Sequence, residues 1–238
     1  MIDRSTQRSV GYGQATAADI DAGLRKYMLG VYNYMSIALV ITGLAAFGVS
    51  QSPELMYAIF GSPLKWVVML APLGMVFFLS ARINSLQAST AQILFWVFSV
   101  LMGVSISSIF IAYEMGSIAR VFFITAASFA GLSLVGYTTK KNLSAMGSFL
   151  IIGLFGLIIA SIVNIFIGSS GLEFVISVLG VLIFAGLTAY DTQRIKLMYM
   201  ESDHSEVAQK KSIMGALSLY LNFLNMFLFL LQLFGNRE

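Results

Sequence analysis

One acidic residue stands out because it closes a long uncharged stretch of sequence. Asp191 directly follows the run Phe174–Tyr190, which contains no charged side chain. A charge in the hydrocarbon of a membrane costs about 2.5–3.5 kcal/mol on insertion scales, so such a residue normally faces protein and pairs with a partner. Two interpretations of Asp191 are open. It is either a helix-end carboxylate tied to Arg194 three residues later, or an inward-facing carboxylate that serves an ion path.

A basic residue holds the corresponding place at the end of another short run. Arg82 follows the uncharged run Trp66–Ala81. The helices that carry Arg82 and Asp191 are expected to run in the same direction, so both side chains should lie at a similar depth. Arg82 either extends to the lipid headgroups or forms a latch with Asp191 across the bundle. The other acids beside the runs, Glu114 and Glu173, are expected to be solvated at the outer ends.

The last apolar run carries a stripe of small and amide side chains. The stripe consists of Gly215, Ser218, Asn222 and Asn225. Spacings of three and four place these residues on one helix face, which is a packing seam, a polar lining, or both. One loop joins this helix to that of Asp191, so we expect Asn222 to approach Asp191. Thr188, one turn before Asp191, is expected to join Ser218 and Asn225 in the polar lining.

The elements that must position these residues are membrane-spanning helices. Apolar residues make up 58% of the 238 residues and charged residues 11%, against roughly 45–50% and roughly 25% in soluble domains. This composition excludes a disordered chain, a nucleic-acid binder and an ordinary soluble enzyme. The uncharged runs lack the apolar–polar alternation of barrel strands, and they are long enough for helices that cross a lipid bilayer. Seven helices are predicted, near 28–49, 64–83, 91–113, 120–139, 145–168, 174–197 and 212–234. The fold class is therefore an all-α polytopic membrane protein, with a flexible cytoplasmic tail over 1–26 and a transmembrane domain over 27–238.

The basic residues predict how the chain is oriented in the bilayer. Of the 14 Lys and Arg residues, eleven fall on the side of the N-terminus and three on the other side. Loops rich in Lys and Arg stay in the cytoplasm. We therefore expect a cytoplasmic N-terminus and, because the number of helices is odd, a C-terminus on the opposite side.

Motifs of catalysis and of cofactor binding are absent from the sequence. It contains no Gly-rich phosphate loop, no His-Glu-x-x-His and no Gly-x-Ser-x-Gly. It has no cysteine and a single histidine, His204, which falls in a loop. Thiolate sites and a histidine-based intramembrane metal site are thus excluded, and we expect neither enzymatic activity nor a resident cofactor.

Several segments resemble one known family. Residues 186–193 (GLTAYDTQ) and 215–223 (GALSLYLNF) are similar to two signatures of the Bax inhibitor-1 family, also called the transmembrane Bax inhibitor motif family. Residues 107–110 (SSIF) and 136–141 (GYTTKK) fit its bacterial inner-membrane branch. The resemblance covers essentially the whole chain after the N-terminal tail.

The resemblance implies a seven-helix bundle in which six helices surround a central seventh. It also implies a pH-sensitive calcium leak, in which two aspartates on the sixth and seventh helices share a proton. An arginine of the second helix can latch to the first aspartate. By motif, the first aspartate is Asp191, which would then contact the permeating calcium ion, and the arginine is Arg82. Other bacterial relatives resemble regulators of a membrane-bound protease, so the alternative is a non-transporting modulator that binds another membrane protein.

The sequence departs from the family pattern at the second aspartate, where it has Asn222. Two neighbouring carboxylates raise one pKa because both resist being charged together, and an Asp–Asn pair lacks this effect. Asn222 still offers an oxygen to a cation and an NH2 group to Asp191. Calcium binds six to eight oxygens, and the charge of the ligands tunes its affinity. We therefore expect weaker calcium affinity and a flatter pH response than in Asp–Asp relatives. The lack of a second intramembrane acid also weakens a third hypothesis, a proton-coupled transporter.

Overall fold

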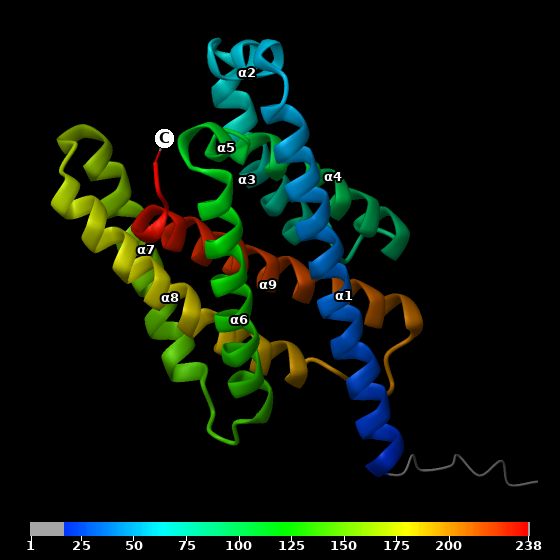
Figure 1. Cartoon of the computed structure of the whole chain (residues 1–238). Helices are drawn as coiled ribbons and strands as arrows, with labels where there is room; N and C mark the ends of the chain where they lie inside the picture. The colour runs from blue at the N-terminus through cyan, green and yellow to red at the C-terminus, as the bar shows by residue number, and fades with distance from the viewer. Residues whose placement is uncertain (1–16, 238) are drawn as a thin grey trace, which may run out of the picture.

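Apolar helices account for most of residues 17–237, the part of the chain that the computed structural model describes (Figure 1). Within it the helices are α1 (Ala17–Ser50), α2 (Pro53–Phe60), α3 (Leu64–Arg82), α4 (Ala88–Ile106), α5 (Ile109–Ala112), α6 (Met115–Thr138), α7 (Ser144–Ile167), α8 (Ser170–Leu197) and α9 (Ser205–Phe234). Among these described residues, seven spans are long and apolar enough to cross a membrane, with α4 and α5 together forming one of them. The all-α polytopic fold class is confirmed.

The first helix begins earlier than the sequence indicated. α1 starts at Ala17, so residues 17–26 of the expected tail are helical, while residues 1–16 lie outside the described residues. The extension has a packing partner just beyond the C-terminal end of α8. Leu24 and Tyr27 pack against the core, and the Tyr27 ring lies 5.6 Å from the ring of Tyr199. This contact gives the extra turns a buried face, which the sequence pattern alone did not show.

Two local features also differ from the predicted helices. The expected helix 91–113 is interrupted after Ile106, where the Ser107 hydroxyl donates a 2.8 Å hydrogen bond to the Val104 carbonyl. Such side-chain bonds compete with the helical pattern of the backbone. The short helix α2 was not predicted. It starts at Pro53, and the Ser52 hydroxyl accepts a hydrogen bond from the amide of Leu55, which is an ordinary helix start.

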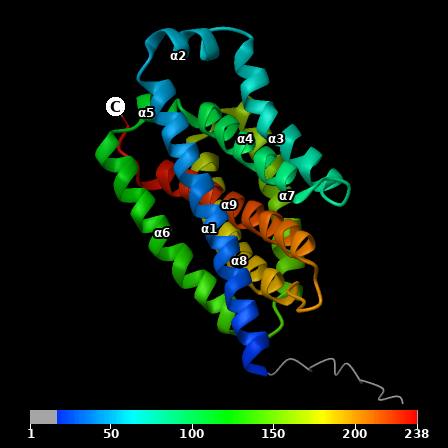
Figure 2. The ribbon, with the colours of Figure 1, turned by 90° about the vertical axis from the view of Figure 1, so that its right-hand side faces the viewer.

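The last helix, α9, is the most deeply buried element. It runs through the middle of the bundle in both views (Figures 1 and 2), and it packs against α8, α1, α6 and α4. The resemblance implied six helices around the seventh. In the structure four helices pack directly around α9, whereas α3 packs mainly on α4, and α7 on α8. Four helices therefore form an inner layer against α9, and α3 and α7 lie outside this layer.

The outer helices present apolar side chains to the surroundings. On α7 only Gly147 and Leu157 are buried, and the exposed side chains include Phe149, Phe155 and Phe166. Soluble monomers rarely expose contiguous apolar patches of this kind. Such a surface is stable in contact with the hydrocarbon of a lipid bilayer.

A tight contact between α6 and α8 leads to a testable prediction. A Cβ atom on Gly136 would overlap the carbonyl oxygen of Ala189, whereas one on Gly131 of the same helix would meet nothing within 4 Å. We expect Gly136→Ala to destabilise the protein by about 1–3 kcal/mol because the helices must separate. The matched control Gly131→Ala should be neutral or stabilising, because alanine favours a helix by about 1 kcal/mol over glycine. Thermal unfolding in detergent, followed by circular dichroism, measures both. Equal behaviour of the two variants would show that the close approach is not needed.

Candidate functional site between α8 and α9

Asp191 lies on the face of α8 that packs against α9, and its side chain is only 12% exposed. The amide nitrogen Nδ2 of Asn222 donates a 2.8 Å hydrogen bond to its Oδ2 atom. The guanidinium of Arg194 lies 3.2 Å from its Oδ1 atom. Both carboxylate oxygens are thus engaged. The carboxylate faces α9 and is also tied to Arg194, as the first interpretation expected. Its service to an ion path stays a prediction.

Arg194 links α8 to α9 at the end of the bundle where a loop joins these two helices. Its guanidinium donates a 3.4 Å hydrogen bond to the Ser218 hydroxyl and lies 5.8 Å from the centre of the Tyr190 ring. The side chain is 46% exposed. Arg194 therefore stands between Asp191 and the aqueous end of the interface.

The structure does not bring Arg82 to Asp191. Arg82 is exposed at the end of α3, a helix that packs mainly on α4 and α2. The expected latch is replaced by the pair with Arg194, which is one turn away on the same helix. A partner three residues along a helix needs no rearrangement to reach Asp191, whereas Arg82 belongs to an outer helix.

The expected polar lining is only partly assembled. Ser218 joins the Asp191 cluster through Arg194. Thr188 is fully buried and donates to the carbonyl of Phe184 in its own helix. The amide of Asn225 likewise donates to the carbonyl of Leu221. These two polar groups are satisfied locally, which serves helix packing rather than a shared polar surface.

Two neighbours of Asp191 tie α8 to α6 and to the segment between α6 and α7. Gln193 donates from Nε2 to the Lys141 carbonyl at 2.8 Å and accepts at Oε1 from the Leu143 amide at 2.9 Å. The Thr192 hydroxyl lies 3.3 Å from that of Ser133 on α6. Neither residue was singled out from the sequence, although both belong to the segment 186–193. They hold the backbone that carries Asp191 in one position.

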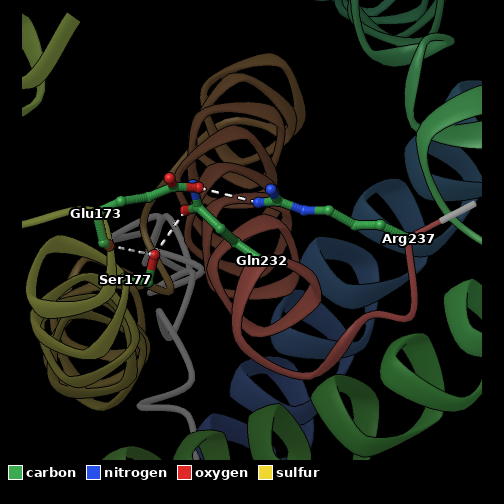
Figure 3. Close-up of polar contacts among 4 residues, drawn as sticks. All are labelled: Glu173, Ser177, Gln232 and Arg237. Atoms are coloured by element: carbon green, nitrogen blue, oxygen red, sulfur yellow. Dashed lines mark hydrogen bonds and ion pairs between the residues drawn. The ribbon is translucent and has the colours of Figure 1, made fainter. Parts of the chain in front are cut away.

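A second polar cluster lies at the other end of the α8–α9 interface (Figure 3). Gln232 of α9 donates a 2.8 Å hydrogen bond to Oε1 of Glu173 and accepts a 2.6 Å bond from the Ser177 hydroxyl. Arg237 lies 3.0 Å from the same Glu173 oxygen. Glu173 was expected only to be solvated. It instead connects α8, α9 and the segment that follows α9.

Apolar side chains separate the two clusters. Asp191 follows Glu173 by eighteen residues, or roughly 27 Å of helix rise. Between them the ring of Phe229 fills the space above Gly180 and stacks on Phe184 with ring centres 6.1 Å apart. The α8–α9 interface is therefore polar at both ends and closed by aromatic rings in between.

The cluster around Asp191 is not a closed metal site. Among the described residues, no three His, Cys, Asp or Glu side chains come together. Calcium requires six to eight oxygen ligands. Asp191 can therefore offer one charged contact to a passing cation, and Asn222 one further oxygen if its amide turns over.

The contacts of the second cluster predict which of two substitutions destabilises the protein more. Gln232→Ala leaves the Ser177 hydroxyl without its cross-helix bond and removes one donor from Glu173, which should cost about 1–3 kcal/mol. Arg237→Gln removes an exposed ion pair, which should cost about 1 kcal/mol or less and nothing at high salt. Thermal unfolding at low and high salt measures both effects. A larger loss in Arg237→Gln, or a loss in Gln232→Ala that salt abolishes, would contradict this assignment.

Comparison with known proteins identifies the family of the chain. Residues 24–238 match the family model described as inhibitor of apoptosis-promoting Bax1. The chain is 47% identical over 218 residues to the uncharacterized protein RP147 of Rickettsia prowazekii, covering 92% of each chain. It is 46% identical to an uncharacterized protein of Caulobacter vibrioides, over 96% of this chain and 98% of the relative. It is 42% identical to the inner membrane protein YbhL of Escherichia coli, over 91% of this chain and 94% of YbhL. The chain therefore belongs to the Bax inhibitor-1 family of membrane proteins.

Proposed function

We propose that the protein is a passive cation leak, with calcium as the permeating ion, that is gated at Asp191. The observation that carries this proposal is the buried carboxylate between two membrane helices, bonded on one oxygen by Asn222 and on the other by Arg194. A carboxylate at this position costs free energy in a bilayer. A pure packing contact would not require a charge, whereas attraction of a cation does.

The contacts suggest how the gate works. In the present arrangement both oxygens of Asp191 are occupied, so a cation reaches the carboxylate only when Arg194 moves away. Arg194 is half exposed and held by an ion pair and one long hydrogen bond, so it is the member of the cluster that can leave. Arg194 then has the role that the sequence had given to Arg82. A proton on Asp191 removes the charge that attracts the cation, so flux should fall as the pH decreases.

Removal of the charge at Asp191 is the first test of this function. Calcium flux from liposomes that contain the purified protein is measured between about pH 6 and pH 8. Asp191→Asn should abolish the pH dependence, because an amide has no proton to gain in this range. Arg194→Gln should raise flux, whereas the matched control Arg82→Gln should leave it unchanged. A wild-type pH profile in Asp191→Asn would exclude Asp191 as the gate.

A second prediction concerns Asn222. Asn222→Asp places two carboxylates at hydrogen-bond distance, where they must share a proton. The pH dependence of flux should therefore become steeper than in the wild type. Asn225→Asp is the matched control, because Asn225 is one turn away and bonds its own helix. It should not change the profile, and an equal effect of both substitutions would argue against a specific pair.

The alternative function is a non-transporting modulator that binds another membrane protein, such as a membrane protease. The observation that favours it is the apolar seal around Phe229, which closes the α8–α9 interface in this structure. A modulator should tolerate Asp191→Asn and should be sensitive to changes in the loop between α8 and α9. Neither candidate function includes catalysis or a resident cofactor.

The proposed location is the bacterial inner membrane, with a cytoplasmic N-terminus and the C-terminus on the opposite side. The description of the relative YbhL as an inner membrane protein supports the location. The excess of basic residues at one end of the spans supports the orientation.

A further inference from the structure

A groove runs between α1 and α6 along the depth of the bundle. Both helices pack against α9, but α1 otherwise packs mainly on α4, and α6 on α8. The space left between α1 and α6 contains three cavities of about 540, 530 and 200 Å³, each lined by residues of both helices. We call this space the α1–α6 groove.

Most of this groove is lined by apolar side chains and therefore suits hydrocarbon. Its walls include Met35 of α1 and Phe129 of α6, and its floor is formed by Phe223 and Phe227 of α9. Apolar cavities do not hold ordered water. At the depth of the membrane spans the alternative to water is a lipid acyl chain.

The mouth of the first cavity has a different chemistry. Arg25, Tyr32 and Tyr137 line it together with apolar residues. Arg25 lies near the start of one span and Tyr137 near the end of another, so both lie at the level of the lipid headgroups. Within residues 21–237 no carboxylate lies within ion-pair distance of Arg25. A guanidinium at this level matches a phosphate, and tyrosine is a common residue at the membrane interface.

The length of the first cavity points to its occupant. Arg25 and Met35 are ten residues apart on α1, which is about 15 Å of rise and half of the roughly 30 Å hydrocarbon layer. The cavity therefore matches the length of the acyl chains of one leaflet, with its basic mouth at the level of their headgroups.

We propose that the first cavity of the α1–α6 groove binds an anionic phospholipid of the leaflet on the Arg25 side. The phosphate lies on Arg25, and an acyl chain lies along Met35 and Phe129. The site is separate from Asp191 and does not depend on transport by the protein.

Native mass spectrometry of the full chain in detergent tests this site, with phosphatidylglycerol or phosphatidylcholine of identical acyl chains as probes. The wild type should retain one phosphatidylglycerol in preference to phosphatidylcholine. Arg25→Gln should lower its affinity about fivefold, as expected for one basic side chain near a phosphate. The neighbour Lys26 does not line the cavity, so Lys26→Gln is the matched control and should retain wild-type binding.

A second pair of variants tests the acyl-chain part of the groove. Ala130 lines the first cavity, whereas Ala127 of the same helix does not. Ala130→Trp should displace the lipid, and Ala127→Trp should not. Thermal unfolding without added lipid shows whether any of these variants is misfolded. If one is, the other pair of variants tests the proposal.

Three results would overturn the proposal. The first is equal retention of both phospholipids by the wild type. The second is retention that neither Arg25→Gln nor Ala130→Trp changes. The third is a dimer mass that Ala130→Trp abolishes, which would assign the groove to a second copy of the chain.

Discussion

The hydrogen bond from Asn222 to Asp191 is the contact on which the arrangement of the bundle depends. An unpaired carboxylate at this depth would be costly, because neither lipid nor apolar side chains can replace its water. Asn222 satisfies one oxygen and Arg194 the other. The two helices that carry these groups form the most extensive packing contact of the bundle. The carboxylate therefore joins α8 to α9 at this end of their interface, while Gln193 ties the same part of α8 to the segment before α7.

The bilayer determines where the remaining polar groups lie. The outer helices α3 and α7 face lipid with apolar side chains, so charges are confined to the ends of the spans and to the α8–α9 interface. Within this interface the polar groups gather at both ends, at Asp191 and at Glu173, and aromatic rings seal the middle. Two polar ends with an apolar middle suit both proposed functions, the gated leak and the rigid binding partner.

The sequence was informative where the bilayer imposes a strong constraint. Uncharged runs predicted the seven spans because few charges are tolerated in hydrocarbon, and one connecting loop sufficed to pair Asn222 with Asp191. The choice between Arg82 and Arg194 could not be made from the sequence, because it depends on α3 packing outside the inner layer. The cluster around Glu173 was missed because Ser177 and Gln232 are ordinary helix residues, and only the packing of α8 on α9 brings them together. The early start of α1 similarly depends on Tyr199, a residue far away in the sequence.

A double-mutant cycle in stability measures the central contact most directly. The free energies of unfolding of Asp191→Ala, Asn222→Ala and the double variant are compared with that of the wild type. A hydrogen bond to a buried carboxylate predicts a coupling free energy of about 1.5–3 kcal/mol between the two positions. Additive losses, within about 0.5 kcal/mol, would show that Asp191 and Asn222 do not hold α8 and α9 together.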